Sequence, residues 1–554
     1  MKKFWKVLTI MGMLAPLFQG FGTSVDAAEA GVETKPEEVT ITLHKRSFTS
    51  LPAEVPNNGL EDNDFGGDPL PGVDFSLFDV TDVYYDLLKD NPTTVEADDG
   101  MTSAEAIQLI QTDLTSEWFQ DYQLTAEKTV TTTSVGVAEF SELEVTETTG
   151  EKRDKAYLFL ETYSPAAIAK VATPMVVLMP VMMPNTNNPG QWLDTYNDDI
   201  HLYPKNETQE SSKVMNIDPS ELQEIELSDG STISYADLEK GHVINYTITA
   251  PIPYFIDSIK ADETPVINNF IIEDKPTAGL TYFDQEMVVT AGATELTLNE
   301  DYTLEEVDNG FKLTILTEKD GKANKTTLTK LAASRGGQLT VNYAMKLTAT
   351  ITPDVLQDNT ATINIGRGDA YDYSEDVVPP EKVVTGGRQF EKYDASSKAK
   401  LGGAEFELWD AAKEKYAVFY KDGTALSSYQ NDADSVEWVD DQTGATKFVS
   451  LVDTGKFEVQ GLEYGTYYMK EVKAADGYAL PAGAAAFTEF TVELGSYNGF
   501  EEIGQPTDVE VPNTKKGALP STGGNGIYLF LLIGSFLMLA AYGGYRKLKK
   551  PTEI

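Results

Sequence analysis

Short segments in which apolar and polar residues alternate recur along this 554-residue chain, and they constrain its fold more than any other feature. Between Glu38 and Pro512 these segments are rich in Thr, Val, Ile and Tyr, and Gly, Asn, Asp and Pro separate them. Alternation with a period of two is typical of β-strands that bury one face, and long helical periodicity is scarce. The sequence therefore predicts an all-β chain of sandwich or barrel domains, with one helix from Ser103 to Trp118 inserted in the first.

Length and composition exclude several classes of protein. At roughly 150 residues per domain, the length predicts about three or four domains. The chain has 88 acidic and 43 basic residues, which give a net charge of −45 and exclude a nucleic-acid binder driven by bulk charge. It has no cysteine, so disulfides, thiol catalysis and cysteine-bound metals are excluded. The three histidines are scattered, and we expect neither a metal site nor a cofactor.

The N-terminus predicts secretion. Three lysines near the start precede an apolar run that ends at about Phe21, and small residues follow up to Ala27 and Ala28. This is the order of a secretory signal, here residues 1–27, cleaved after Ala27 or Ala28. A membrane anchor is the alternative, but glycine and proline interrupt the run and it is short for a bilayer span.

The C-terminus combines three features in a fixed order. Leu519-Pro520-Ser521-Thr522-Gly523 precedes an apolar stretch from Ile527 to Tyr545, and a basic tail follows. This order, over residues 519–554, resembles the cell-wall sorting signal of Gram-positive surface proteins. The resemblance implies that a sortase cleaves after Thr522 and passes its carbonyl to an amine, which leaves the protein anchored to peptidoglycan at the cell surface. The apolar stretch is long enough to be a temporary transmembrane hold.

Two parts of the chain resemble each other at a distance. Residues 70–77 and 401–408 share a pattern, as do residues 157–162 and 467–472. Such spaced self-similarity indicates two copies of one β-sandwich module, at about 37–206 and 383–514. Residues 207–375 lack these markers and are expected to form a related but distinct β-domain. Val377 to Lys382, with two prolines, is expected to be a linker.

Each of the two modules places one lysine, one glutamate and one asparagine on the apolar faces of its strands. Residues i, i+2 and i+4 share a strand face, so Lys45 lies on the same side as Ile41 and Leu43. The same rule turns inward Glu161 and Asn206 in the first module and Lys392, Glu471 and Asn513 in the last.

A buried lysine has an unusual chemistry. Burying its charge costs several kcal/mol, so in an apolar site it tends to lose its proton and become a nucleophile. A buried carboxylic acid can then bind the asparagine carbonyl and transfer protons while ammonia leaves. The product is a Lys–Asn isopeptide bond formed once, by the protein on itself. A buried salt bridge or a lysine that extends to solvent is the alternative.

These modules resemble the collagen-adhesin B-type domains of Gram-positive pilins, which have an immunoglobulin-like sandwich fold and carry this lysine, glutamate and asparagine set. The middle domain is similar to the fimbrial isopeptide-forming domain through residues 241–248, 272–274 and 279–282. By position, this similarity implies Asp274 as its acid and Asn359 as its acceptor. Lys213 is the expected amine, because it shares a face with Met215 and Ile217.

Lys205 is expected to point outward, because it is adjacent to the inward Asn206. The segment Tyr203-Pro204-Lys205, after Trp192, resembles the pilin motif, whose lysine accepts the threonine of the next subunit. An ordinary solvated lysine is the alternative. The implied partners are a pilus-type and a housekeeping sortase and identical subunits in a head-to-tail fibre, with minor pilins and host surface ligands as further candidates.

Two weaker motifs carry little weight. Arg367-Gly368-Asp369 matches an integrin-binding tripeptide, but a match of three residues is common by chance. Residues 62–68 lack ligands at key positions of a calcium loop and are expected to form a solvated loop.

The sequence predicts the backbone subunit of a covalent surface pilus, polymerised through Thr522 and Lys205. Its only catalysis would be the single-turnover formation of its own bonds, with Glu161, Asp274 and Glu471 as the acids, so it is not expected to be an enzyme. The alternative is a wall-anchored monomeric adhesin or a tip pilin that binds a host ligand.

Overall fold

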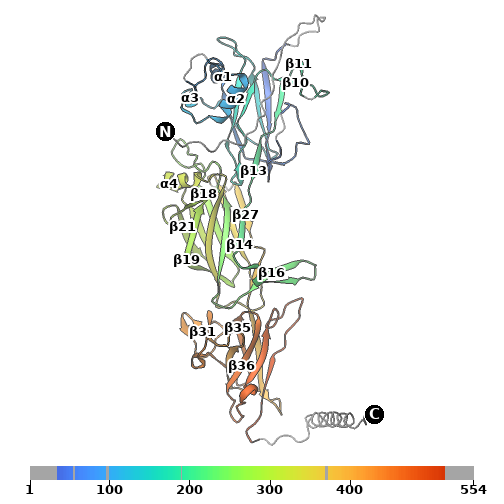
Figure 1. Cartoon of the computed structure of the whole chain (residues 1–554), viewed down its shortest axis with the longest axis vertical. Helices are drawn as coiled ribbons and strands as arrows, with labels where there is room; N and C mark the ends of the chain where they lie inside the picture. The colour runs from blue at the N-terminus through green and yellow to red at the C-terminus, as the bar shows by residue number, and fades with distance from the viewer. Residues whose placement is uncertain (1–33, 54–56, 95–98, 189, 369–371, 518–554) are drawn as a thin grey trace, which may run out of the picture. The chain divides into compact units, whose positions relative to one another are not determined.

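The computed structural model describes residues 34–517 except 54–56, 95–98, 189 and 369–371 (Figure 1). The predicted signal peptide, Thr522 and the predicted membrane stretch lie outside the described residues. Strands dominate the described part, which confirms the prediction of an all-β fold. No helix in this part is long and apolar enough to cross a membrane.

The chain divides into two compact units. The N-terminal unit contains the residues up to 221 together with 243–346 and 357–382. The C-terminal unit contains residues 222–242, 347–356 and those from 383 onward. The N-terminal unit holds two sandwiches, and the C-terminal unit holds one.

The first sandwich has three sheets, in the orders β12-β1-β6, β3-β2-β13-β8 and β5-β4-β7-β9, and a hairpin of β10 and β11. Its strands are β1 (Glu38–His44), β2 (Arg46–Phe48), β3 (Asp68–Pro69), β4 (Asp74–Asp79), β5 (Lys128–Thr131), β6 (Val137–Glu144), β7 (Ala156–Tyr163), β8 (Ile168–Lys170), β9 (Met175–Leu178), β10 (Met182–Pro184), β11 (Trp192–Tyr196), β12 (Asp199–Leu202) and β13 (Lys205–Thr208). Alternate residues of β1, β4, β6 and β7 fill its core, as the period-two pattern requires.

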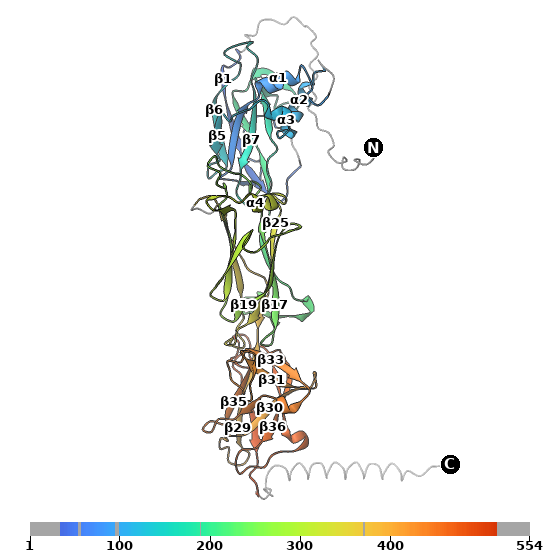
Figure 2. The ribbon, with the colours of Figure 1, turned by 90° about the vertical axis from the view of Figure 1, so that its left-hand side faces the viewer.

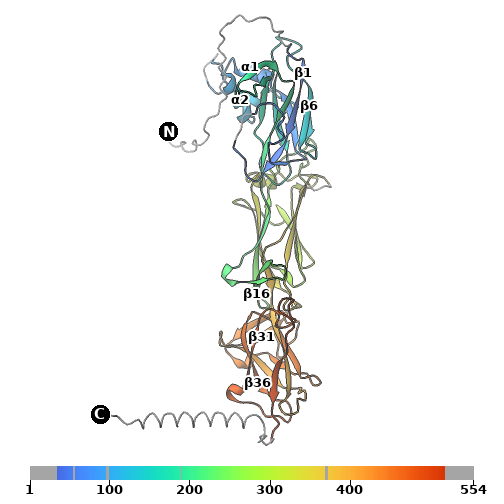
Figure 3. The same ribbon diagram turned by 90° about the vertical axis from the view of Figure 1, so that its right-hand side faces the viewer.

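Three helices lie beside this sandwich: α1 (Thr81–Leu87), α2 (Ser103–Thr112) and α3 (Glu117–Gln120). Figure 3 labels α1 and α2. The prediction of one helix from Ser103 to Trp118 was therefore wrong in extent. The helix begins with a capping box between Thr102 and Glu105 and ends at Asp113, which leaves the helical conformation. The Asp113 carboxylate instead accepts a hydrogen bond from Trp118 Nε1 at 2.7 Å. The helices share their own apolar cluster with the outer face of β7.

The middle sandwich consists of two five-stranded sheets, in the orders β14-β17-β25-β19-β20 and β21-β22-β18-β26-β27 (Figure 2). Its elements are β14 (Ser212–Met215), β17 (Val243–Pro251), β18 (Asn269–Pro276), β19 (Leu280–Ala291), β20 (Thr294–Glu295), β21 (Tyr302–Val307), β22 (Gly310–Ile315), β23 (Glu318–Lys319), β24 (Lys322–Ala323), α4 (Lys325–Ala332), β25 (Gln338–Leu347), β26 (Asn359–Gly366) and β27 (Tyr373–Val377). The inward residues of β17, β18, β25 and β26 are buried.

The sandwich of the C-terminal unit packs a β35-β29-β38 sheet against a larger one built on β32-β31-β30-β36-β37, with β33 and β34 added to it. A third sheet has the order β15-β16-β28. The strands are β15 (Leu222–Glu226), β16 (Thr232–Asp237), β28 (Lys382–Val384), β29 (Gly386–Asp394), β30 (Glu405–Asp410), β31 (Lys415–Lys421), β32 (Thr424–Ala425), β33 (Ser435–Val439), β34 (Lys447–Val449), β35 (Lys456–Leu462), β36 (Gly465–Lys473), β37 (Phe487–Val492) and β38 (Val509–Asn513).

Two segments that precede residue 383 are fixed inside the C-terminal unit. The Asp354 carboxylate accepts hydrogen bonds from the backbone N–H groups of Gly495, Tyr497 and Asn498 at 2.8–2.9 Å. The buried Lys240 Nζ donates to the carbonyls of Ala349 and Asn431 at 2.7 and 2.9 Å. This unit is therefore larger than the range 383–514 chosen from the sequence.

Candidate functional site

The first module brings Lys45, Glu161 and Asn206 together in its core. Lys45 Nζ donates to Glu161 Oε2 at 2.7 Å and also to Asn206 Oδ1. The Asn206 amide donates to the other Glu161 oxygen at 2.7 Å, and the Ala172 N–H donates to Glu161 Oε2 at 3.1 Å. The acid therefore contacts both the amine and the amide nitrogen of this cluster.

The last module repeats this arrangement with Lys392, Glu471 and Asn513. Lys392 Nζ donates to Glu471 Oε2 at 2.7 Å, and the Asn513 amide donates to Glu471 Oε1 at 2.6 Å. All six side chains of the two clusters are at most 4% exposed, so water reaches neither of them readily. One carboxylate again faces the amine with one oxygen and the amide with the other.

Matching strand pairings produce the two clusters. The segment that carries the lysine runs antiparallel to one neighbouring strand and parallel to the other, which carries the asparagine or leads to it. The parallel pairs are β1–β12 and β2–β13 in the first module and β29–β38 in the last. Each glutamate is paired across the sheet with a phenylalanine, Phe75 or Phe406. Each lysine Nζ lies 5.4 Å from the centroid of that ring, so the phenyl group forms an apolar wall of the site.

Sequence reasoning missed a glycine that supports each lysine strand. The backbone N–H of Lys45 donates to the Gly136 carbonyl, and that of Lys392 donates to the Gly455 carbonyl. Gly136 and Gly455 have φ values of +74° and +66°, and a Cβ there would lie 2.6 and 2.2 Å from the carbonyl oxygen of the lysine. Only glycine fits both the conformation and the space. The signal in the sequence was a glycine one residue before β6 and before β35.

The middle sandwich brings Lys213, Asp274 and Asn359 into one buried region, but here a tyrosine lies between the acid and the asparagine. Lys213 Nζ donates to Asp274 Oδ1, which also accepts a hydrogen bond from the Tyr343 hydroxyl at 2.8 Å. The Asn359 amide donates to the Tyr343 hydroxyl at 3.1 Å. Tyr343, which sequence reasoning missed, thus bridges the acid and the asparagine.

Burial sets the electrostatics of the three clusters. It lowers the pKa of Lys45 and of Lys392, although the neighbouring glutamate partly opposes the change. In the middle cluster it lowers the pKa of Lys213 to about 8 and raises the pKa of Asp274. These directions favour the neutral amine, and in the middle cluster also the neutral acid.

Lys205 begins β13 and is partly exposed, while the adjacent Asn206 is buried. Its Nζ lies 5.5 Å from the centroid of the Phe65 ring, and this ring stacks on Tyr203 at 4.4 Å. The loop that contains Phe65 therefore packs over the Tyr-Pro-Lys segment, and the prediction that residues 62–68 form a solvated loop was wrong for Phe65. Asp62 and Asp64 in the same loop are exposed.

The arginine of the Arg367-Gly368-Asp369 tripeptide makes contacts within the N-terminal unit. Arg367 lies 3.1 Å from Asp74 and 3.3 Å from Asp372, and its guanidinium carbon is 3.6 Å from the centre of the Tyr163 ring. Asp369 lies outside the described residues. Integrin-type recognition would have to break these contacts first.

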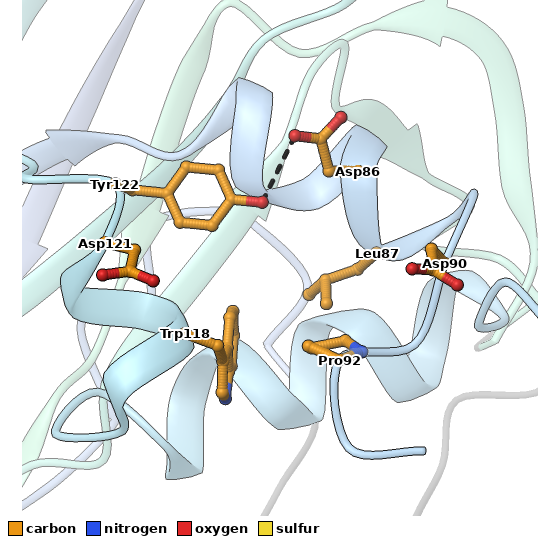
Figure 4. A pocket seen from close by; sticks show the side chains of 7 residues that line it. All are labelled: Asp86, Leu87, Asp90, Pro92, Trp118, Asp121 and Tyr122. Carbon is orange, nitrogen blue, oxygen red and sulfur yellow. Dashed lines mark hydrogen bonds between the residues drawn. The ribbon is translucent and has the colours of Figure 1, made fainter. Parts of the chain in front are cut away.

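A pocket of about 420 Å³ lies among the helices of the first domain (Figure 4). Three aspartates, Leu87, Pro92 and two aromatic side chains line it, and the Tyr122 hydroxyl donates to Asp86 at 3.2 Å. It contains none of the predicted site residues. In the described part of the chain, no group of three His, Cys, Asp or Glu side chains is arranged to hold a metal ion.

Family models match three parts of the chain. Residues 36–207 match the Gram-positive pilin subunit D1, N-terminal domain, and residues 386–498 match the prealbumin-like fold domain. Residues 511–550 match the LPXTG cell wall anchor motif. The chain is a Gram-positive pilin subunit. The anchor motif makes it a sortase substrate, and the pilin belongs to a pilus attached to the cell wall.

Similar proteins include the fimbrial subunit type 2 of Actinomyces naeslundii, which is 25% identical over 93% of the pilin and 91% of its own length. Two solved structures are also similar: the full-length pilus protein RrgB of Streptococcus pneumoniae and the major pilin SpaD of Corynebacterium diphtheriae. They are 17% and 22% identical, cover 89% of the pilin and all of their own chains, and have TM-scores of 0.48 and 0.40.

We predict that Gly455→Ala destabilises the C-terminal unit more than a matched control, Gly477→Ala. Both glycines have positive φ, but a Cβ at Gly477 would meet nothing within 4 Å. The control should cost about 1 kcal/mol for the left-handed conformation, and Gly455→Ala a further 1–3 kcal/mol or so for the clash with Lys392. Hydrogen exchange of β29 and β35 measures the difference. Equal effects would show that the lysine strand does not require this close approach.

Proposed function

We propose that this pilin is the backbone subunit of a covalent fibre, joined by sortase through Thr522 to Lys205 of the next subunit and cross-linked internally by three Lys–Asn bonds. The observation that carries the proposal is the burial of three lysines, each against one carboxyl group with an asparagine beside it. An ion pair of this kind gains little stability after desolvation, so three of them in one chain favour a chemical role.

In the two outer clusters the contacts suit amide exchange. The neutral lysine amine attacks the asparagine Cγ, the Cγ–Nδ2 bond breaks, and one ammonia leaves for each new amide bond. One glutamate oxygen faces the amine and can take its proton, and the other faces the Nδ2 that must be protonated to leave. Glu161 joins Lys45 to Asn206 in this way, and Glu471 joins Lys392 to Asn513.

In the middle cluster Asp274 is the proposed acid, Lys213 the amine and Asn359 the acceptor. The opposite changes in the pKa of Lys213 and Asp274 allow a proton to pass from the ammonium to the carboxylate, which leaves a neutral nucleophile. Tyr343 holds the asparagine amide and the acid in place through its hydroxyl. Because it stands between the amide nitrogen and Asp274, it is the proposed relay for the proton that ammonia takes.

Such bonds would stabilise a chain that has no cysteine. The Lys45–Asn206 bond would close a loop of 161 positions, and the Lys392–Asn513 bond a loop of about 120. If they constrain the unfolded chain as disulfides do, each contributes about 4–5 kcal/mol before any strain. This contribution suits a fibre under mechanical load.

The intermolecular bond uses a different face of the same strand. Sortase would cleave the Thr522–Gly523 bond and transfer the Thr522 carbonyl to Lys205 Nζ, which loses a proton while the glycine segment leaves with a free amine. Lys205 is partly exposed and Asn206 is buried, so the strand pleat separates the two reactions. A pilus-type sortase would form this bond, and a housekeeping sortase would attach the finished fibre to peptidoglycan.

We predict that Lys205→Ala abolishes polymerisation but not secretion or wall anchoring. Cell-wall extracts should contain monomer and no ladder of high-mass species after boiling in detergent, because the acceptor amine is lost. Lys170→Ala is the matched control, since Lys170 lies on the neighbouring strand β8 and its side chain is 65% exposed. A ladder that persists in Lys205→Ala would assign the acceptor to another lysine.

We also predict that Glu471→Ala prevents one internal bond. After correction for the substitution, the intact mass should exceed that of the wild type by about 17 Da, the mass of one ammonia. The melting temperature of the C-terminal unit should fall as well. Glu489→Ala, at an exposed position of the adjacent strand β37, should change neither quantity by a comparable amount. An unchanged mass deficit in Glu471→Ala would contradict the mechanism.

A further inference from the structure

The Phe65 ring contacts the proposed acceptor amine, although Phe65 lies 140 residues from Lys205 in the sequence. Lys205 Nζ is 5.5 Å from the centroid of this ring, within the range of a cation–π interaction. We propose that Phe65 is a positioning residue for polymerisation, which holds the Lys205 side chain in one orientation for attack. This inference rests on the proposed role of Lys205 as the acceptor.

The ring is itself held in place from behind. Phe65 stacks on Tyr203 with ring centroids 4.4 Å apart and an angle of 23° between the planes. Tyr203 is buried and stacks in turn on His44, at 4.7 Å and 13°. The His44 Nε2 is 2.9 Å from the His201 Nδ1. Phe65 therefore forms the outer end of a row of four rings, and the inner rings belong to β1, to β12 and to the residue after β12.

The backbone of the loop is tied to the same row. The Asp62 N–H donates to the Tyr203 hydroxyl, and the Asp64 N–H donates to the Asp62 carboxylate at 3.0 Å. These bonds fix the chain on the N-terminal side of Phe65. The ring thus has a defined place above Lys205, which a freely moving loop would not provide.

The amine also borders a recess in the surface. A cavity of about 230 Å³ is lined by Lys205, Phe65 and Tyr203 and by loop residues that include Asn58 and Leu60. In this proposal the recess receives the incoming acyl group. The ring restricts the orientations of the Lys205 side chain. The recess leaves the amine uncovered.

The size of the effect follows from the interaction. A cation–π contact at an exposed site contributes about 0.5–1 kcal/mol, which corresponds to about a 2- to 5-fold change in an equilibrium. A lysine side chain loses rotamer entropy when it is held in one orientation, and the ring removes part of that entropy before sortase binds. Because the ammonium must lose its proton before attack, the gain should appear in binding of the acceptor and hence in its KM.

The test measures transfer of a labelled peptide ending in Leu-Pro-Ser-Thr-Gly to the mature chain by a pilus-class sortase. The acceptor chain carries Thr522→Ala, so the labelled peptide is the only donor. Phe65→Leu keeps an apolar side chain of similar bulk but removes the ring, and Phe65→Tyr restores it. We expect the acceptor KM to rise about 2- to 5-fold in Phe65→Leu, with kcat changed less than 2-fold, and to return to the wild-type value in Phe65→Tyr.

Phe283→Leu is the matched control, because it removes a ring that lies 4.8 Å from another lysine amine, Lys346 Nζ in the middle sandwich. The acceptor KM of this variant should equal that of the wild type. An unchanged KM in Phe65→Leu, or an equal rise in Phe65→Leu and Phe65→Tyr, would overturn the positioning role. Labelling that persists in Lys205→Ala would instead overturn the proposed acceptor, so the two failures are distinguishable. Intact mass and thermal melting of each variant establish that it folds.

Discussion

The contact between a buried lysine and a buried carboxyl group is the constraint around which each sandwich is built. It requires a strand that carries the lysine inward, a phenylalanine or tyrosine beside it and a dry core around both. In the outer modules it also requires a glycine where the neighbouring strand approaches the lysine backbone. An ion pair alone would offset little of the free energy of desolvation that this burial costs. A covalent bond, once formed, would hold the lysine and the asparagine together without a buried charge.

Each of the three clusters contains a lysine, an acid and an asparagine, but the acid is connected to the asparagine in two different ways. In the outer modules one glutamate contacts the amine and the amide directly. In the middle sandwich the shorter aspartate contacts the amine, and Tyr343 spans the remaining gap to the asparagine. Most acidic residues of the described part of the chain are not buried, so the buried acids of the three clusters are exceptions.

Face alternation predicted the all-β class and the inward positions of Lys45, Glu161 and Lys213, whereas Asp274 was predicted from the resemblance to the fimbrial isopeptide-forming domain. The structure brings Lys45 to Glu161 and Lys213 to Asp274. Alternation could not predict Tyr343, because a tyrosine in a buried strand has the same pattern as any core residue. Phe65 was missed because it lies in a loop without periodicity and meets Lys205 only in the folded chain. The short helices α1 and α4 and the extent of the C-terminal unit also depend on tertiary contacts that a local pattern does not contain.

Protease digestion of the mature chain, followed by tandem mass spectrometry, tests the central claim most directly. The account predicts three branched peptides, in which Lys45 is joined to Asn206, Lys213 to Asn359 and Lys392 to Asn513, each about 17 Da lighter than the sum of its two linear parts. Recovery of these six residues only in linear peptides of unchanged mass would contradict it.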